Sequence, residues 1–540
     1  MKRSLPLKRQ LLNNAVGAGF SHIASTLAVL IAIPFMVHGL GIEQYGFLAL
    51  LAAASKYGGF TDFGIGPSLT RQIAHHNARD EASEVRKTAT FGVMFYSALL
   101  ALGTFVALTF SPALIALGHY RDPVFVHDAI FLLRIFIIAF FAGGLGGSFQ
   151  SFLAGIGRLQ LASKLGAAMS IVGTTIVAVA VVLHQGLIGV AYATALMAVL
   201  GVVAPYIAAR RAYGGPLFAA PSLVTWPIVR SLLSTGGWIQ LTTIMVIFYA
   251  ETDQLIVASV LGLAASGLFD VGRKVARAVR AVSFYFGTAL MPAMAAVQSR
   301  SPDAMKTIVV DGTRYLGVMT MFVSGLLYVE VPNVLTLWIG AGPHNGTIIH
   351  VVRILLVVYL IDSLQAVTMA ALRGAGTPKL EALYTVTNAV VNVGLTIALV
   401  RPFGMNGILA GSVGGMVVGS IFFSIAYCRF KGYDLRASLG APLLRLALAS
   451  IISVAAVMYV LRFVPLAADG SKVHALLTIV CVSVVYAVVY AFVVRIAGVL
   501  STNDLAFAQA SLPVRLRSVF NAPLVRGMFV ASAVPLEKAS

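Results

Sequence analysis

The residues of this sequence best suited to chemistry are four cations inside one apolar segment of helix length, residues 263–295. They are Arg273, Lys274, Arg277 and Arg280. At about 100° per residue, these side chains and Asp270 fall within an arc of roughly 120° on one face of an α-helix. Holding one basic residue at the centre of a bilayer costs on the order of 2.5 to 3.5 kcal/mol even on a lenient scale. If the segment spans a membrane, this face is therefore predicted to line water, pair with acids or bind an anion.

The composition indicates that the segment does lie in a membrane. Of the 540 residues, 59% are hydrophobic and 11% are charged, whereas soluble domains carry roughly 25% charged residues. Apolar stretches of about 20 residues predict about fourteen transmembrane helices in an all-α polytopic membrane protein. The stretches at 229–260 and 264–297 are longer than a bilayer requires, which predicts tilt or bending. The basic N-terminus leads into an apolar run too long for a cleaved signal peptide, so we expect an uncleaved first span.

Basic residues are distributed by membrane side. Of the 38 Lys and Arg residues, 27 fall on one set of alternate loops and the termini, 4 on the other set and 7 within spans. Because loops rich in Lys and Arg stay in the cytoplasm, this bias predicts cytoplasmic N- and C-termini. It also explains the net charge of +19 without nucleic acid as a partner. A cationic helix face inside a membrane span is by default interpreted as a candidate transport site.

The chain aligns with itself at a shift of about 220 residues in five separate places, beginning with Leu40-Gly41-Ile42 and Leu261-Gly262-Leu263. Six predicted spans per half is an even number, so both halves should enter the membrane in the same orientation, with a cavity between them. We predict two pseudo-symmetric six-helix bundles at 1–218 and 219–435, an additional transmembrane helix pair at 436–498 and a cytoplasmic tail at 499–540.

The repeat also pairs intramembrane cations. Lys56 aligns with Arg277, so both are predicted to face the central cavity and to join the anion-binding set. Arg134 aligns with Arg353, and both lie near the outer ends of their spans. A position at the cavity mouth and snorkelling to the lipid headgroups are equally supported for this second pair.

Acidic residues near the cations are candidates for ion coupling or gating. The repeat places Glu251 and Asp253 inside the seventh span, at about the depth of Arg273. We hypothesise that one of them pairs with Arg273 or Lys274 in the empty site and releases it when substrate or a proton arrives. The alternative is a static pair that only offsets the insertion cost. Further candidates for coupling to a cation gradient are Asp62, Asp270 and Asp362.

Motifs for covalent chemistry are missing from the sequence. It contains no GxxxxGK[ST] phosphate loop and no HExxH, CxxC or GxSxG pattern. We therefore expect no ATPase, no catalytic residues, no metal site and no cofactor. The two cysteines lie in or beside apolar helices and predict no disulfide framework.

Four stretches carry a resemblance to a known family. They are residues 40–46 (LGIEQYG), 62–66 (DFGIG) with Arg71 downstream, 155–158 (GIGR), and 253–256 (DQLI) running into Leu261-Gly262. In this order, and with the duplication, residues 10–430 resemble the polysaccharide-exporter branch of the multidrug/oligosaccharidyl-lipid/polysaccharide (MOP) exporter superfamily. The resemblance implies a MATE-like fold of two helix bundles.

It also implies a flippase for polyprenyl-diphosphate-linked oligosaccharide, such as an O-antigen, capsule or exopolysaccharide repeat unit, in the bacterial inner membrane. A lipid-linked diphosphate brings about two negative charges, which arginines in a water-filled cleft can hold by forked hydrogen bonds. One half would rock against the other in alternating access. The implied partners are this glycolipid and membrane lipids, with proton or sodium coupling and contacts with glycan polymerase machinery as further expectations.

Three other functions compete with this interpretation. A peptidoglycan-precursor flippase would typically carry arginines and an acid in its first span, whereas residues 12–37 contain no Arg, Lys, Asp or Glu. A drug/cation antiporter would suit cationic substrates, which four inward-facing cations would repel. A glycan polymerase or ligase would need a substantial outer loop with catalytic groups, and the predicted outer loops are short.

Overall fold

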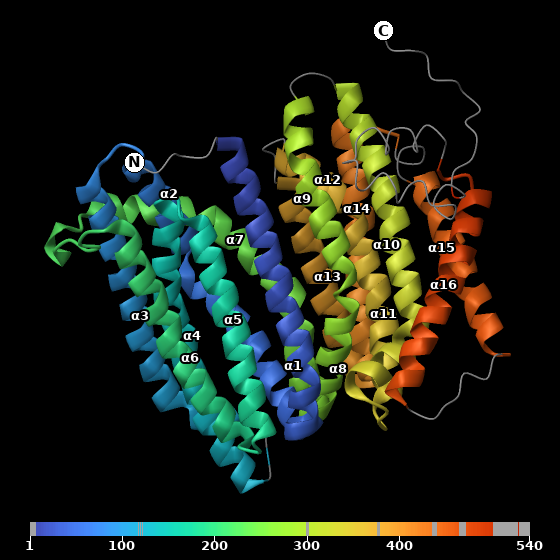
Figure 1. Ribbon diagram of the computed structural model, residues 1–540, viewed down its shortest axis with the longest axis horizontal. Coiled ribbons are helices and arrows are strands. Elements are labelled where there is room, and N and C mark those ends of the chain that lie inside the picture. Colours follow the sequence, from blue (N-terminus) through green and yellow to red (C-terminus); the bar gives the residue numbers. More distant parts are fainter. Residues whose placement is uncertain are drawn as a thin grey trace. The chain divides into compact units, whose positions relative to one another are not determined.

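The computed structural model describes residues 7–116, 118, 120, 122–298, 302–374, 379–434, 440–463, 471–500 and 528. Within this part of the chain the regular structure is entirely helical, without a strand (Figure 1). The α-helices are α1 (Leu7–Gly58), α2 (Ile65–Asn77), α3 (Ala82–Ala116), α4 (Pro123–Gly155), α5 (Leu159–Val182), α6 (Gly186–Tyr213), α7 (Trp226–Ile256), α8 (Leu263–Ala276), α9 (Val279–Gln298), α10 (Pro302–Ile339), α11 (Asn345–Leu364), α12 (Ala366–Gly374), α13 (Lys379–Phe403), α14 (Met405–Lys431), α15 (Ala441–Leu461) and α16 (Lys472–Ile496). Short 3₁₀ segments, η1 (Gly59–Asp62) and η2 (Pro221–Leu223), and a π-helical turn, η3 (Val257–Leu261), lie between them.

Twelve helical stretches in the described ranges are long and apolar enough to cross a membrane. The predicted all-α polytopic fold is therefore confirmed. The predicted number of about fourteen is roughly consistent with these twelve. One of the twelve belongs to α1. This helix has a non-helical residue, Gly41, between the first two predicted spans, 12–39 and 45–73. The predicted span at 264–297 is not among the twelve, and the structure divides it into α8 and α9.

The helices form two compact units, Met1–Gly267 and Leu268–Ser540. In the first unit α4 packs on α2, α3 and α6, while α5 packs on α1 and α6. The repeat groups α7 with the second half of the sequence, yet α7 packs on α1 and α2 in the first unit. The predicted domain limits at 218 and 435 follow the sequence repeat, whereas the two compact units follow helix packing. The predicted limits therefore stay a prediction.

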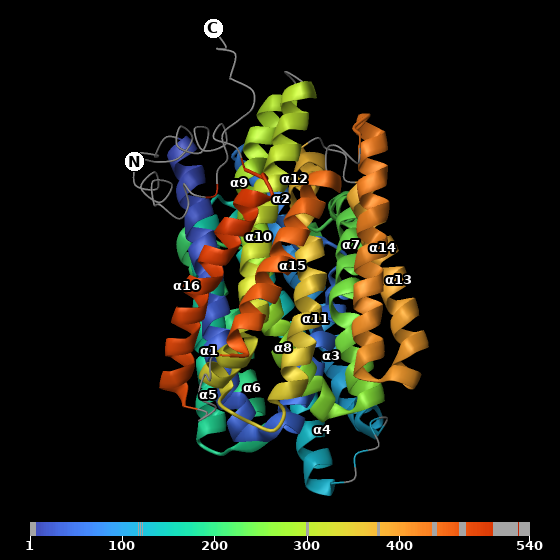
Figure 2. The same ribbon diagram turned by 90° about the vertical axis from the view of Figure 1, so that its right-hand side faces the viewer.

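In the second unit the last two described helices, α15 and α16, pack against α10 (Figure 2). The hydroxyl of Tyr490 on α16 donates to the carbonyl of Val318 at 2.9 Å, and the Ser450 hydroxyl on α15 donates to the carbonyl of Met321 at 3.4 Å. The fully buried Tyr486 of α16 packs on Phe322 of α10. The predicted additional pair is thus attached to α10 by aromatic packing. Almost all of the predicted tail at 499–540 lies outside the described residues.

The two halves of the repeat share backbone turns. Gly41 has φ 77° and ψ 163°, and its repeat equivalent Gly262 has φ 93° and ψ 171°. Gly186 (φ 57°) and its equivalent Gly404 (φ 56°) also match. Glycine suits these positions because a Cβ atom makes such positive φ values unfavourable.

A reciprocal close contact joins α1 to the start of α8 inside the first unit. A Cβ atom on Gly46 would lie 1.8 Å from the carbonyl oxygen of Leu263, and one on Gly267 would lie 2.4 Å from that of Ile42. Gly46 and Gly267 are equivalent in the repeat, as are Ile42 and Leu263. Ser266 strengthens the contact by donating from its hydroxyl to the Gly46 carbonyl at 3.0 Å. The contact thus has local pseudo-two-fold symmetry, and close backbone approach through small residues is a usual way to pack membrane helices.

Gly46→Ala is expected to destabilise the protein, because the added methyl group would overlap the Leu263 backbone. Overpacking of this kind typically costs about 1 to 3 kcal/mol. Gly147→Ala is the matched control, since Gly147 also lies in a helix and a Cβ atom there has nothing within 4 Å. Thermal unfolding of the purified protein in detergent should show a lower Tm for Gly46→Ala and an equal or higher Tm for Gly147→Ala. Equal Tm values for both variants would contradict the close contact.

Candidate functional site

The four predicted cations do not share one continuous helix. α8 ends at Ala276, residues 277 and 278 form a turn, and α9 begins at Val279. Through this turn the backbone amide of Ala278 donates to Val275 at 3.2 Å and that of Arg280 donates to Arg277 at 3.0 Å, both in the tighter i→i−3 pattern. The α-helix is thus interrupted at residues 277 and 278, while the prediction that all four cations share one face stays a prediction. The sequence around the turn holds no Gly or Pro that would have indicated it.

Asp270 on α8 pairs with two of the cations. Its Oδ1 accepts from Nη2 of Arg273 at 3.1 Å, and its Oδ2 accepts from Nζ of Lys274 at 2.5 Å. The spacings of three and four residues place all three side chains on one helix face, as predicted. The Arg273 side chain is 10% exposed and that of Asp270 is 3% exposed. The guanidinium of Arg273 also lies 6.0 Å from the ring centroid of Phe269.

Arg280, beyond the turn, pairs with a different acid. Its Nε lies 3.0 Å from Oδ2 of Asp362 on α11. The hydroxyl of Tyr384 on α13 donates to Oδ1 of the same carboxylate at 3.2 Å. The Arg280 guanidinium lies 5.8 Å from the ring centroid of Tyr359. Three helices of the second unit therefore meet at Asp362, which the sequence named only as a secondary candidate.

Together these residues form a paired cation cluster, defined as Arg273, Lys274, Arg277, Arg280, Asp270 and Asp362. The described ion pairs join three of its four cations to its two carboxylates. The pairs offset much of the cost of placing the cations in a membrane. The side chains of Lys274 and Arg280 keep 31% and 38% of their surface exposed. Part of the cluster is therefore not covered by the protein and can be reached by a ligand.

Lys56 and Asp62 lie in the first unit, near the end of α1 and in η1. Lys56 is exposed and makes no ion pair or hydrogen bond within the part of the chain that the structure describes. Asp62 accepts a hydrogen bond from the hydroxyl of Tyr96 on α3. The next residue to Lys56, Tyr57, contacts Thr252 of α7 through its hydroxyl at 2.6 Å. The assignment of Lys56 to the anion-binding set stays a prediction.

Glu251 and Asp253 are buried in α7, with 6% and 8% of their surface exposed. Both belong to the first unit, whereas Arg273 and Lys274 belong to the second and have Asp270 as a common acid. The hypothesis that Glu251 or Asp253 exchanges with these cations during transport stays a prediction.

The repeat-equivalent arginines Arg134 and Arg353 have different partners. Nε of Arg134 donates to the Ser111 hydroxyl at 2.8 Å, and Nε of Arg353 donates to the Tyr328 carbonyl at 3.3 Å. Each acceptor lies on the preceding helix, beside Pro112 in α3 or one turn before Pro332 in α10. Arg353 also lines a cavity of about 530 Å³. The predicted position at the mouth of a central cavity remains untested for both.

Sequence analysis missed one buried acid, Glu330 on α10. It is 2% exposed; its Oε2 accepts from Nδ2 of Asn333 at 2.9 Å, and its Oε1 has no hydrogen-bond partner among the described residues. The signal was available, because a Glu inside an apolar span is costly and rare.

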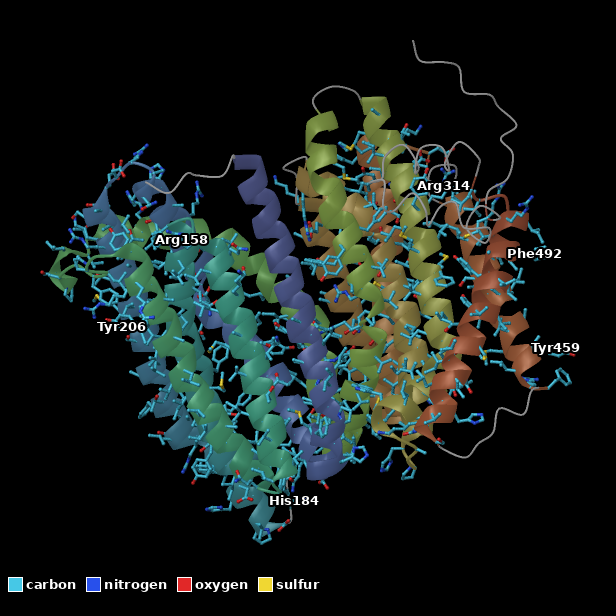
Figure 3. The ribbon with its side chains drawn as sticks, viewed as in Figure 1. Arg158, His184, Tyr206, Arg314, Tyr459 and Phe492 are labelled. Carbon is cyan, nitrogen blue, oxygen red and sulfur yellow. The ribbon has the colours of Figure 1, made fainter. Side chains whose placement is uncertain are left out.

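Two basic residues outside the cluster lie at a helix junction and in an ion pair within one helix. Arg158 lies at the junction of α4 and α5, and Arg314 pairs with Asp311 on its own helix at 3.0 Å (Figure 3). In the described ranges, no three His, Cys, Asp or Glu residues gather closely enough to hold a metal ion.

Comparison with known proteins identifies the family. The sequence model of the family described as "Polysaccharide biosynthesis protein" matches residues 11–298, which is more than half of the chain. The chain belongs to this family. It is 21% identical over 406 residues to a Shigella flexneri protein named "Putative O-antigen transporter", covering 74% of this chain and 93% of that one.

Solved structures show the fold. An inward-facing multidrug transporter of the MATE family, a member of the MOP superfamily, has a TM-score of 0.63 at 17% identity and covers 77% of this chain and 96% of its own. The lipid II flippase MurJ in an inward closed conformation has a TM-score of 0.64 at 12% identity and covers 88% of this chain and 98% of its own. The MATE-like fold and the resemblance to the MOP superfamily are confirmed. The protein is a multi-pass membrane protein of this polysaccharide-biosynthesis family.

Asp270→Asn is expected to destabilise the protein strongly, because two buried or half-buried cations would lose their common carboxylate. Breaking one buried ion pair typically costs about 3 to 5 kcal/mol. Glu330→Gln is the matched comparison, since Asp270 and Glu330 are both 2% exposed and the amide keeps an oxygen for Asn333.

The measurement is the Tm of each purified variant in detergent. We expect a clear decrease for Asp270→Asn and little change or an increase for Glu330→Gln, because burying a charge without a cation is unfavourable. If Asp270→Asn unfolded at the wild-type temperature, the ion pairs could not be what keeps the cations in the membrane.

Proposed function

We propose that this protein is a flippase that moves polyprenyl-diphosphate-linked oligosaccharide from the cytoplasmic to the outer face of the bacterial inner membrane. The family, the similarity to the Shigella flexneri protein named as an O-antigen transporter, and the fold support transport of a polysaccharide precursor. The paired cation cluster supports the choice of a diphosphate as the group that is recognised.

The observation that carries the proposal is the gathering of guanidinium and ammonium groups in the paired cation cluster. Arg273, Lys274 and Arg280 are held on the carboxylates of Asp270 and Asp362 inside helices of an apolar protein. A lipid-linked diphosphate carries about two negative charges and presents oxygens that arginine can bind in forked geometry. A neutral sugar offers no charge to these donors, and a cationic drug would be repelled by them.

The ion pairs give the cluster a means of binding and release. Asp270 and Asp362 hold Arg273, Lys274 and Arg280 in the empty site. Diphosphate oxygens would compete with these carboxylates for the same donors. Binding of the diphosphate is then an exchange of ion-pair partners. Because no unpaired charge has to be placed in the membrane, the free-energy cost of binding stays low. The polyprenyl chain can stay in the lipid while the head group crosses by alternating exposure of the cluster to the two faces.

The same exchange offers a route to ion coupling. When the diphosphate takes a cation, the carboxylate that had paired with it loses its countercharge. A proton or sodium ion is the natural replacement, because an unpaired carboxylate is costly in a low-dielectric site. Asp270 and Asp362 therefore stand beside Glu251, Asp253 and Asp62 as candidate coupling acids.

Two other transport functions fit the fold less well. The fold is shared with a lipid II flippase and with multidrug transporters. The first span of this chain has no Arg, Lys, Asp or Glu between residues 12 and 37, which is atypical of peptidoglycan-precursor flippases. The gathered guanidinium and ammonium groups would repel cationic drugs. Synthesis of polymerised glycan by the purified protein would instead identify a glycan polymerase.

Arg277→Gln is expected to lower export of the glycan, because one charge-assisted contact to the diphosphate is lost. A hydrogen bond to a charged group contributes about 1.5 to 3 kcal/mol, so the rate should fall by about 10- to 100-fold. Combining Arg273→Gln, Arg277→Gln and Arg280→Gln should abolish export, and Lys56→Gln should have a weaker effect. Lys87→Gln is the control, because it removes a cation from an i,i+3 pair with Glu84 at the start of α3.

The measurement is complementation of a gene deletion. Lipid-linked glycan that accumulates on the cytoplasmic face is extracted and identified by mass spectrometry, and the amount of inserted protein is quantified in the same membranes. We expect the triple variant to accumulate glycan as the deletion does, while Lys87→Gln restores export. Wild-type export by an inserted triple variant would refute the role of the cluster, and accumulation of a peptidoglycan precursor in the deletion would refute the substrate.

A further inference from the structure

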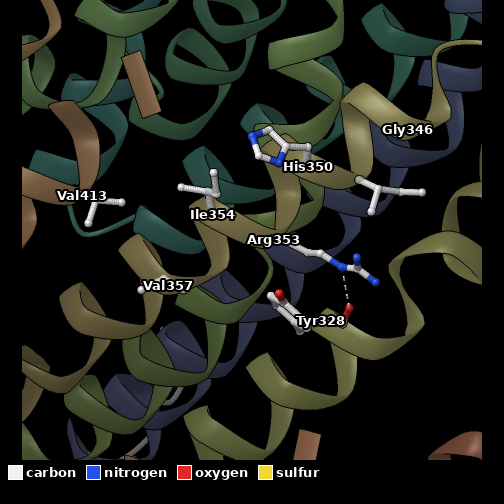
Figure 4. Close-up of a pocket in the computed structure, with 8 residues that line it drawn as sticks. Tyr328, Gly346, His350, Arg353, Ile354, Val357 and Val413 are labelled. Atoms are coloured by element: carbon white, nitrogen blue, oxygen red, sulfur yellow. Dashed lines mark hydrogen bonds between the residues drawn. The ribbon is translucent and has the colours of Figure 1, made fainter. Parts of the chain in front are cut away.

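A cavity of about 530 Å³ lies in the second unit, outside the paired cation cluster (Figure 4). Its lining comes from α10, α11 and α14. The polar lining residues used below are Tyr328, His350 and Arg353, and the apolar ones are Ile354, Val357 and Val413. None of them belongs to the cluster, so the cavity is a separate candidate site.

The cavity follows one face of α11. Positions 350, 353, 354 and 357 recur at helical spacing and extend over roughly 10 Å at 1.5 Å per residue. This face is opposite to Ile348 and Val351, which pack near Gly272 of α8. Both polar lining residues of α11, His350 and Arg353, lie in its first half with Ile349 beside them, and only the apolar Ile354 and Val357 follow. The cavity is therefore a groove with a cationic end and an apolar end.

Arg353 is held at the cationic end by a defect in α10. Pro332 has no amide hydrogen, so the carbonyl of Tyr328 four residues earlier lacks its usual helical donor. Nε of Arg353 donates to that carbonyl at 3.3 Å, and the guanidinium lies 4.9 Å from the ring centroid of Tyr328 (Figure 4). These two contacts fix the plane of the guanidinium beside α10.

The rest of the guanidinium remains available. Arginine has five N–H donors, and only Nε–H of Arg353 is used among the residues that the structure describes. His350, one turn earlier, contacts Oδ1 of Asn406 through its Nε2 at 2.7 Å and joins α11 to the start of α14 at the rim. Arg353 is therefore the one permanently charged group in the lining.

We propose that this groove binds an anionic membrane phospholipid, with its phosphodiester on Arg353 and an acyl chain along Ile354, Val357 and Val413. A single guanidinium matches the single charge of a phosphodiester, whereas a diphosphate would leave a second charge without a partner. The order of polar and apolar lining residues matches the order of headgroup and chain in a lipid. Because the groove is built from α10, α11 and α14, a bound lipid would bridge these helices and stabilise the second unit.

The test is native mass spectrometry of the full-length protein released from detergent with added phosphatidylglycerol or phosphatidylcholine of identical acyl chains. We expect the wild type to retain phosphatidylglycerol in preference, and Arg353→Gln to lower this retention about tenfold, the loss of one charge-assisted contact. Arg134→Gln is the matched control: it changes the repeat-equivalent arginine, which bonds to Ser111 and does not line the groove, and should retain the lipid.

A second variant tests the apolar end without touching the charge. Val413→Phe should fill the groove and lower retention of both lipids, so the proposal stays testable if Arg353→Gln folds poorly. Three results would overturn it: equal retention of phosphatidylglycerol by wild type and Arg353→Gln, no preference of the wild type between the two lipids, or Arg353-dependent displacement of phosphatidylglycerol by an equimolar prenyl diphosphate. The last result would instead assign the groove to a diphosphate-bearing lipid.

Discussion

The cost of placing charge in a membrane is the constraint that organises the second unit. Each cation of the cluster would be unfavourable alone in hydrocarbon, and two carboxylates make three of them acceptable. Asp270 accepts from Arg273 and Lys274 on its own helix, while Asp362 reaches Arg280 from α11. The turn between α8 and α9 separates these two sets of pairs. Local helical spacing accounts for the first set, and helix packing accounts for the second.

The duplicated halves share backbone geometry more closely than side-chain partners. Glycines at equivalent turns adopt the same positive φ, and Gly46 and Gly267 make the same close approach in both directions. At equivalent cationic positions the environments differ. Lys56 is exposed near the end of α1, and Arg134 and Arg353 bond to a side chain and to a backbone carbonyl, respectively. Backbone turns limit which residues can occupy a position, whereas a cation can be satisfied by any nearby acceptor.

The proline inside α10 creates an acceptor that α11 uses. Pro332 frees the Tyr328 carbonyl, and Arg353 takes it. This contact orients the remaining donors of Arg353 toward a groove. A tyrosine hydroxyl plays the comparable role at the acids, since Tyr384 donates to Asp362 in the second unit and Tyr96 donates to Asp62 in the first. The charged groups of the spans are thus positioned by neutral partners as well as by opposite charges.

The sequence alone determined the helical membrane fold, the duplication and the presence of a cationic segment, because hydropathy, helical spacing and glycine at special turns are local properties. It also predicted that Asp270 lies on the face of Arg273 and Lys274. Only the tertiary structure decided that α8 and α9 are separate helices, that Asp362 is the partner of Arg280, and that Glu330 is buried with a single hydrogen bond. Each of these depends on which helices pack together, and no spacing along the chain encodes that.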